Sequence, residues 1–143
     1  MEKLNNKRQN LCNALTRLDE AVVDFGKLKS DLSNETELRL YRAFRDSMIQ
    51  RFEFCVDLFW KYLKFGLEKE LKKESEYNSP KTVVRSACNA RFITEQDSEI
   101  IIKMIEDRNL SSHTYKEELA DQISAKIGNY FCVMKTYFDK LNF

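Results

Sequence analysis

Glycine and proline are scarce in this chain of 143 residues, which contains three glycines and one proline. An all-β sandwich or barrel needs these residues at its many turns, so such a fold is nearly excluded. Long apolar runs are also lacking: none approaches the roughly 18 residues that a membrane-spanning helix requires, and residues 1–10 are polar and charged. We therefore expect a cytoplasmic protein that does not enter a membrane.

Residues that bind metal ions are few and scattered. His113 is the only histidine, and the four cysteines form no CxxC pair. Structural zinc needs four clustered thiolate or imidazole ligands, so we predict no metal site, and no cofactor is indicated. The cysteines, Cys12, Cys55, Cys88 and Cys132, are interpreted as small buried side chains of a protein in a reducing compartment.

Neither sign of charge predominates, because 24 basic residues stand against 23 acidic ones. The net charge of +1 provides no global field for a polyanion, so nucleic-acid binding would need a local patch. One basic stretch consists of Lys61, Lys64, Lys69, Lys72 and Lys73. Glutamates interrupt this stretch, and we interpret it as a solvated helix face, with contact to RNA phosphates as the alternative.

Apolar residues recur at spacings of three, four and seven, which is the period of an α-helix. The pattern predicts helices over about 2–30, 35–73 and 80–92, then from 95 onwards, and from 114 to the chain's end. No repeat or linker interrupts this pattern. We predict an all-α fold: a single domain, residues 1–143, forming an up-and-down bundle of four or five helices.

Capping residues support the predicted helix starts. Ser79 is followed by Pro80 at the first helical position, and Thr114 with Glu117 forms a capping box. Asn34 and Thr94 are the other predicted caps. The second helix also has an apolar surface too wide for one packing face, so we expect it to be central or at a subunit interface. The extra apolar residues are Phe44, Phe54, Leu58, Trp60 and Phe65.

Arg108 departs from the pattern of a plain bundle. It lies four residues after Met104 and seven after Ile101, so a continuing helix aims its guanidinium along the buried stripe. An unpaired buried charge is costly, and Arg108 must therefore meet a partner or open onto a cleft. Glu53 and Asp57 are candidate partners, because they are four residues apart on one face of the second helix.

His113 immediately precedes the predicted cap at Thr114. The positive end of a helix disfavours imidazolium, and a neutral imidazole is what a general base requires. In one continuous helix Arg108 and His113 would face roughly 140° apart, so they cooperate only across a helix break, which the intervening Asn-Leu-Ser-Ser segment allows. The alternative is a buried ion pair at Arg108 and a hydrogen-bonded loop residue at His113.

Three ordered blocks of sequence carry a resemblance to a known family. Arg108 and His113 match the R-x4-H pattern of HEPN domains, which Tyr115 extends to R-x4-H-x-Y. Their surroundings resemble the EDRN…SHTY block of the nucleotidyltransferase substrate-binding protein family. Residues 50–54 resemble that family's QRFEF helix, and residues 79–85 its SP..V.R segment. A bare R-x4-H pattern arises by chance, whereas three blocks in the same order are specific.

The resemblance implies an all-helical homodimer that is encoded beside a minimal nucleotidyltransferase and forms a complex with it. One function attached to such proteins is that of a metal-independent endoribonuclease toxin, which its partner neutralises. In related toxin–antitoxin pairs the nucleotidyltransferase adds AMP to the motif tyrosine, which is Tyr115 here. The other function is that of a noncatalytic subunit that binds a nucleotide or another substrate for the nucleotidyltransferase.

These implications assign a role to each residue of the motif. His113 takes a proton from a ribose 2′-hydroxyl, and Arg108 holds the scissile phosphate of RNA. Asn109 either contacts phosphate or braces the loop, and Glu53 either orients Arg108 or faces solvent. Tyr115 is either the AMP acceptor or an ordinary surface tyrosine. A bundle that serves only in assembly is a third possibility for the whole chain.

Overall fold

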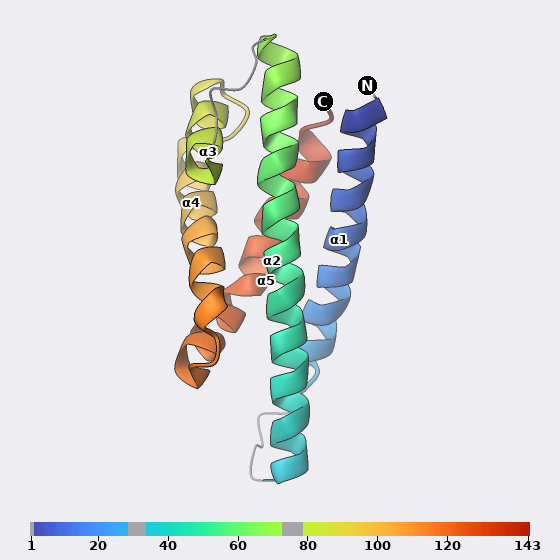
Figure 1. Cartoon of the computed structure of the whole chain (residues 1–143), viewed down its shortest axis with the longest axis vertical. Coiled ribbons are helices and arrows are strands. Elements are labelled where there is room, and N and C mark those ends of the chain that lie inside the picture. The colour runs from blue at the N-terminus through green and yellow to red at the C-terminus, as the bar shows by residue number, and fades with distance from the viewer. Residues whose placement is uncertain (1, 29–33, 73–78) are drawn as a thin grey trace.

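The computed structural model describes residues 2–28, 34–72 and 79–143, which form five α-helices (Figure 1). A short 3-10 turn, η1, joins the last two helices. The elements are α1 (Glu2–Gly26), α2 (Glu35–Leu71), α3 (Pro80–Asn89), α4 (Glu95–Leu110), η1 (Ser111–His113) and α5 (Glu117–Lys140). These residues contain no strand, and the predicted all-α bundle is confirmed.

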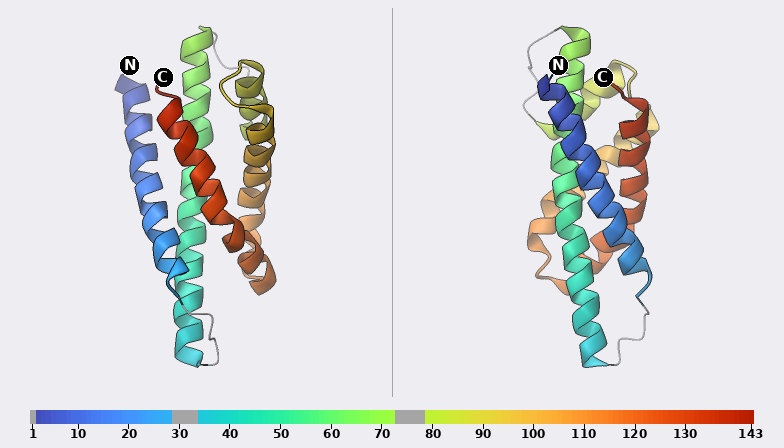
Figure 2. Two further views of the ribbon diagram at one scale, coloured as in Figure 1. Left: turned by 180° about the vertical axis from the view of Figure 1, so that it is seen from behind. Right: turned by 90° about the vertical axis from the view of Figure 1, so that its right-hand side faces the viewer.

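The longest helix, α2, is the centre of the bundle. It packs against α1, α3, α4 and α5. In Figure 1, α1 and α4 lie on opposite sides of α2, and α5 passes behind it; Figure 2 shows α5 from the other side. The predicted central placement of α2 explains part of its wide apolar surface, because Leu58, Trp60 and Phe65 pack against the core, whereas Phe44 and Phe54 remain exposed.

The core is continuous along α2. Phe52, Phe59 and Leu63 are at most 1% exposed, and Phe52 stacks on Tyr130 of α5 with 5.7 Å between the ring centroids. Burying side chains of this size supplies most of the driving force for folding. In the part of the chain that the structure describes, no helix combines the length and apolar character needed to cross a membrane.

Three predicted caps are confirmed. The side chains of Asn34, Ser79 and Thr94 each accept a hydrogen bond from a backbone N–H two or three residues on, at 2.8, 3.3 and 3.1 Å. Pro80 is the first residue of α3, where its missing N–H leaves no hydrogen bond unmade. These caps fix the starts of α2, α3 and α4. Two of these helices carry the candidate site residues, with Glu53 on α2 and Arg108 on α4.

Two helices end earlier than their apolar stripes predict. The first helix ends at Gly26 rather than near residue 30, and residues 29, 30 and 73 lie outside the described ranges. The helix predicted over 80–92 ends at Asn89, because the chain turns back at Arg91, which has φ 64°. The Phe92 N–H then donates to the Ala87 carbonyl at 2.9 Å, which closes the helix end.

The cysteines are all free, but they are not all buried. Cys55 is fully buried, Cys12 and Cys88 are half-buried, and Cys132 is exposed on α5. The prediction of a buried side chain is therefore wrong for Cys132. Its position on the outer face of an amphipathic helix explains why, since spacing alone does not separate a core cysteine from a surface one.

We expect native-state alkylation to label Cys132 first and Cys55 last. Burial raises the pKa of the Cys55 thiol to about 12, so the reactive thiolate is scarce there, and packed side chains also block access. The measurement is mass spectrometry of peptides after timed iodoacetamide treatment. Equal labelling rates at the two positions in the folded protein would contradict this expectation.

Candidate functional site

Arg108 points from the last turns of α4 onto α2, where two carboxylates bind it. Its Nε and Nη2 donate to the two oxygens of Asp57 at 3.1 and 3.0 Å, and its Nη1 donates to Glu53 Oε2 at 2.8 Å. The two-point contact with Asp57 fixes the plane of the guanidinium. Arg108 thus meets the partners that the spacing on α2 predicts, and Glu53 is turned toward Arg108.

Ser111 completes this cluster, and the sequence reasoning missed it. Its Oγ lies 2.8 Å from Glu53 Oε2 and 2.6 Å from the Arg108 backbone oxygen, so one hydroxyl hydrogen serves two acceptors. Ser111 is 3% exposed. Its position three residues after Arg108 is the only signal in the sequence, because a serine in a polar segment otherwise looks like an ordinary loop residue.

The contacts with Asp57 and Glu53 do not occupy every hydrogen-bond donor of the Arg108 guanidinium. It carries five N–H groups, and the contacts with Asp57 and Glu53 use three of them. Its side chain is 27% exposed. The hydrogen bond to Asp57 raises the pKa of Arg108, so the group stays cationic. Two N–H groups on a fixed, charged and partly exposed guanidinium are suited to binding an oxyanion.

His113 lies beyond the end of α4, at the end of η1. The helix stops at Leu110, so the predicted break between Arg108 and His113 is present. The imidazole is exposed and lies edge-on to the ring of Tyr115, with 6.0 Å between the centroids at an angle of 78°. Tyr115 is 76% exposed, as predicted. Both rings are therefore accessible at the surface of this chain.

The predicted capping box at Thr114 and Glu117 is wrong. The fifth helix begins at Glu117, and its N-cap is Lys116, whose side chain makes no capping hydrogen bond. The physical reason is that Glu117 does not reach back to Thr114: its carboxylate accepts a hydrogen bond from Arg45 of α2 at 2.7 Å. A tertiary ion pair has replaced the local cap.

Two motif residues therefore lie further from the start of α5 than predicted. His113 lies three residues before the N-cap instead of next to it, and its carbonyl accepts a hydrogen bond from the Lys116 N–H at 3.1 Å. The N-terminus of α5 is therefore not adjacent to the His113 imidazole, contrary to the prediction. Tyr115 precedes the N-cap and does not occupy the first helical position.

Asn109 is exposed in the last turn of α4. Its backbone oxygen accepts a hydrogen bond from Ser112 Oγ at 3.1 Å, and its side chain makes no hydrogen bond to the residues described here. The amide of Asn109 is thus available to solvent or to a ligand.

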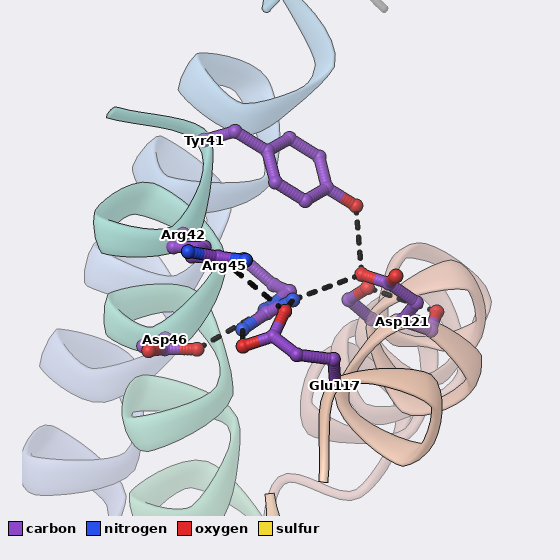
Figure 3. A network of polar contacts seen from close by, with 7 residues as sticks. Tyr41, Arg42, Arg45, Asp46, Glu117 and Asp121 are labelled. Carbon is purple, nitrogen blue, oxygen red and sulfur yellow. Dashed lines mark hydrogen bonds and ion pairs between the residues drawn. The ribbon is translucent and has the colours of Figure 1, made fainter. Parts of the chain in front are cut away.

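A second charged cluster, centred on Arg45, fastens the start of α5 to α2 (Figure 3). Arg45 is 1% exposed and donates to Glu117 at 2.7 and 3.3 Å, to Asp121 at 3.0 Å and to Asp46 at 3.1 Å. The Tyr41 hydroxyl donates to Asp121 at 2.9 Å. This cluster sets where α5 begins and thereby limits the path of the chain that carries His113.

The stability of this cluster depends on pH. The hydrogen bond from Arg45 lowers the pKa of Glu117 below its usual 4.5, so the folded protein binds this proton less readily than the unfolded chain. The stabilisation is therefore complete above pH 4.5 and is lost as the pH falls below it. We expect the melting temperature of the wild type to fall more steeply than that of Glu117→Gln between pH 5 and 3, measured by circular dichroism. Parallel curves would contradict this.

The end of α4 is also held from its other side. Asp107 is 2% exposed, and it accepts hydrogen bonds from the Tyr130 hydroxyl at 2.6 Å and from Lys126 Nζ at 3.4 Å. Consecutive residues of α4 thus bind different neighbours, since Asp107 contacts α5 whereas Arg108 contacts α2. The corner between α4 and α5, which contains η1 and His113, therefore follows a helix end that both α2 and α5 hold in place.

Solved structures share this arrangement of helices. A protein from Thermus thermophilus is 29% identical, with a TM-score of 0.68 over 88% of this chain and 99% of that chain. A tri-AMPylated HEPN toxin from Shewanella oneidensis, solved in complex with an MNT antitoxin, is 16% identical, with a TM-score of 0.69 over 95% of this chain and 93% of that chain. A toxin–antitoxin structure with AMP-PNP is 15% identical, with a TM-score of 0.71 over 97% of each chain.

These similarities define the class: the chain has the helical fold of HEPN toxins. A family model described as nucleotidyltransferase substrate binding protein like matches residues 6–143. The chain therefore belongs to this family, as the three sequence blocks predict. A search of curated proteins gave no match.

Proposed function

We propose that this protein is the toxin of a pair with a minimal nucleotidyltransferase and that it cleaves single-stranded RNA without a metal ion. Family membership and the similarity to HEPN toxin structures support the pairing. The observation that carries the proposal is the corner itself. A guanidinium fixed by Glu53 and Asp57 keeps two N–H groups, and an exposed imidazole follows five residues later.

The proposed reaction is a transesterification within the RNA. His113 takes the proton of a ribose 2′-hydroxyl, and the resulting oxygen attacks the adjacent phosphorus. The bond from phosphorus to the 5′-oxygen breaks, giving a 2′,3′-cyclic phosphate and a 5′-hydroxyl that gains a proton from water. The nucleophile belongs to the substrate, so no metal-bound water is required. Arg108 stabilises the charge that develops on the phosphate oxygens.

We further propose that two copies of the chain form the groove in which this reaction occurs. Phe54 and Leu110 are 55% and 44% exposed, and they lie next to Glu53 and close to Arg108 in sequence. Leu40 and Phe44 are also exposed on α2. Exposed apolar side chains on α2 and at the end of α4 favour association between copies of the chain. A homodimer formed there places two copies of the corner beside one RNA strand.

Tyr115 is the proposed site of neutralisation. Its hydroxyl attacks the α-phosphorus of ATP, pyrophosphate leaves, and the phenolic proton passes to solvent. The ring is exposed and lies beside His113, so an attached AMP brings a phosphate and an adenine to the RNA site. A negatively charged group held there competes with the RNA phosphate for Arg108.

The second candidate function is a noncatalytic subunit that binds a nucleotide for the nucleotidyltransferase. The two N–H groups that Arg108 retains suit an anionic ligand equally well when no bond is cleaved. The family description favours this candidate.

The test compares RNA cleavage with AMP transfer. The purified protein is incubated with labelled single-stranded RNA in EDTA, before and after treatment with the nucleotidyltransferase, ATP and magnesium. We expect the wild type to cleave RNA only before treatment and to gain one or more AMP groups by mass spectrometry. Tyr115→Phe should cleave RNA in both cases. A wild type that neither cleaves RNA nor arrests growth when expressed alone would overturn the toxin proposal in favour of the noncatalytic subunit.

A further inference from the structure

Where α1 packs on α2, two lysines of α1 lie over an aromatic ring of α2, and two lysines of α2 lie close to that ring along the helix. Lys3 and Lys7 of α1 place their Nζ atoms 5.3 and 4.2 Å from the centroid of Phe65 on α2. Lys61 lies one helical turn before Phe65, and Lys64 directly precedes it. We call these four residues the lysine cluster.

The lysine cluster makes no ion pair among the residues that the structure describes, although Glu68 lies one helical turn beyond Lys64 on α2. Within residues 2–28, 34–72 and 79–143, every ion pair of the structure is made by other residues. Burial, followed by the charges of Lys3, Lys61 and Lys64, lowers the pKa of Lys7. Four cations at close range repel one another, and a polyanion relieves that repulsion.

The cluster begins one helical turn from the Arg108 site. Asp57, Lys61 and Lys64 are spaced by four and three residues, so they share one face of α2. At 1.5 Å per residue, Lys61 lies about 6 Å and Lys64 about 10 Å further along the helix than Asp57. Asp57 is the residue that holds Arg108. Lys61 and Lys64 therefore lie on the same face of α2 as the Arg108 site, with the partly exposed carboxylate of Asp57 between them and Arg108.

We propose that the lysine cluster binds the phosphodiester backbone of the single-stranded RNA whose scissile bond lies at Arg108. This inference rests on the proposed function and extends it, because it assigns a path to the strand outside the reacting bond. Single-stranded RNA carries regularly spaced negative charges, and a strand that extends past Arg108 along α2 brings its next phosphates toward these four cations. The cluster gives no base specificity, because lysines contact the phosphates and not the base edges.

The sequence alone does not reveal this surface. Only Lys61 and Lys64 belong to the basic stretch that the sequence shows along α2. The other half of the cluster comes from α1, more than fifty residues earlier. Packing of α1 on α2 brings the two pairs together.

The test measures RNA binding separately from RNA cleavage. In a His113→Ala background, the affinity for a labelled single-stranded oligoribonucleotide is measured by fluorescence anisotropy over a range of salt concentrations. The variants are Lys61→Gln/Lys64→Gln, Lys3→Gln/Lys7→Gln and all four changes together. Lys135→Gln/Lys140→Gln on α5 is the matched control, because both lysines are exposed and the change in net charge is the same.

Loss of two phosphate contacts should reduce the slope of log affinity against log salt by about 1.4, and loss of four by about 2.8. We expect each double variant of the cluster to bind RNA roughly tenfold more weakly at low salt. The α5 control should keep the parent slope, and Lys61→Arg/Lys64→Arg should retain binding. Unchanged melting temperatures show that the variants are folded.

The remaining outcomes are distinguishable. If all cluster variants bind RNA with the parent slope, the proposed RNA-binding role of the lysine cluster is wrong, and the proposed function is unaffected. An equal loss in the α5 control also overturns that role, because the effect then follows net charge rather than position. A protein that neither binds nor cleaves RNA overturns both proposals.

Discussion

His113→Ala is expected to slow RNA cleavage by about 10²- to 10⁴-fold, the usual cost of removing a general base. The fold should be unaffected, because the imidazole is exposed and its ring contacts Tyr115 only edge-on. The measurement is the single-turnover rate of cleavage of a labelled RNA in EDTA, together with the melting temperature. Lost cleavage at an unchanged melting temperature separates chemistry from stability.

Arg108→Ala provides the contrasting variant. It should also abolish cleavage, but it leaves Glu53 and Asp57 facing each other without their cation, and we expect it to destabilise the fold by about 1–3 kcal/mol. The RNA affinity of each variant then separates an effect on binding from an effect on the chemical step, because His113→Ala should bind RNA as tightly as the wild type. Cleavage at the wild-type rate in His113→Ala would rule out the assignment of His113 as the base.

Arg45→Met is expected to have the largest effect on stability, lowering the free energy of unfolding by about 2–3 kcal/mol. The guanidinium is 1% exposed and binds Glu117, Asp121 and Asp46. Removing it leaves three carboxylates without a shared cation. The cost stays below the top of the range for buried pairs because these carboxylates are about half exposed and regain water.

Arg39→Met on the same helix is the control. Arg39 pairs with Glu35 one turn away, and both side chains are more than three-quarters exposed. Such pairs contribute about 0.5 kcal/mol or less. Urea denaturation of the two variants measures the difference directly. Equal loss of stability in Arg45→Met and Arg39→Met would show that the Arg45 cluster does not stabilise the start of α5.

The helices and most of their starts are predictable because their causes are local. Apolar spacing gives the buried face of each helix, and Asn34, Ser79 and Thr94 cap backbone groups only two or three residues away. The predicted break between Arg108 and His113 is present, although the Thr114 cap that placed it is wrong, because α4 ends at Leu110 and α5 begins only at Glu117.

The failed prediction at Thr114 has the opposite cause. A capping box competes with any other partner for the same carboxylate, and Arg45 is such a partner, 72 residues away from Glu117. The sequence did contain a signal for it. Arg45 falls on the apolar stripe between Tyr41 and Met48, the same pattern that singled out Arg108. A cation on a buried stripe predicts a partner without identifying the partner.

By itself the sequence determined the helical class, the family and the residues of the Arg108 and His113 motif. Helical periodicity and short motifs depend only on residues that are close together in the sequence. Only the tertiary structure decided that Asp57 and Glu53 both bind Arg108, that Ser111 joins them, and that α5 starts at Glu117. The lysine cluster belongs to this second group. Side chains from distant segments meet only when helix packing fixes their distances, and charge interactions depend on those distances.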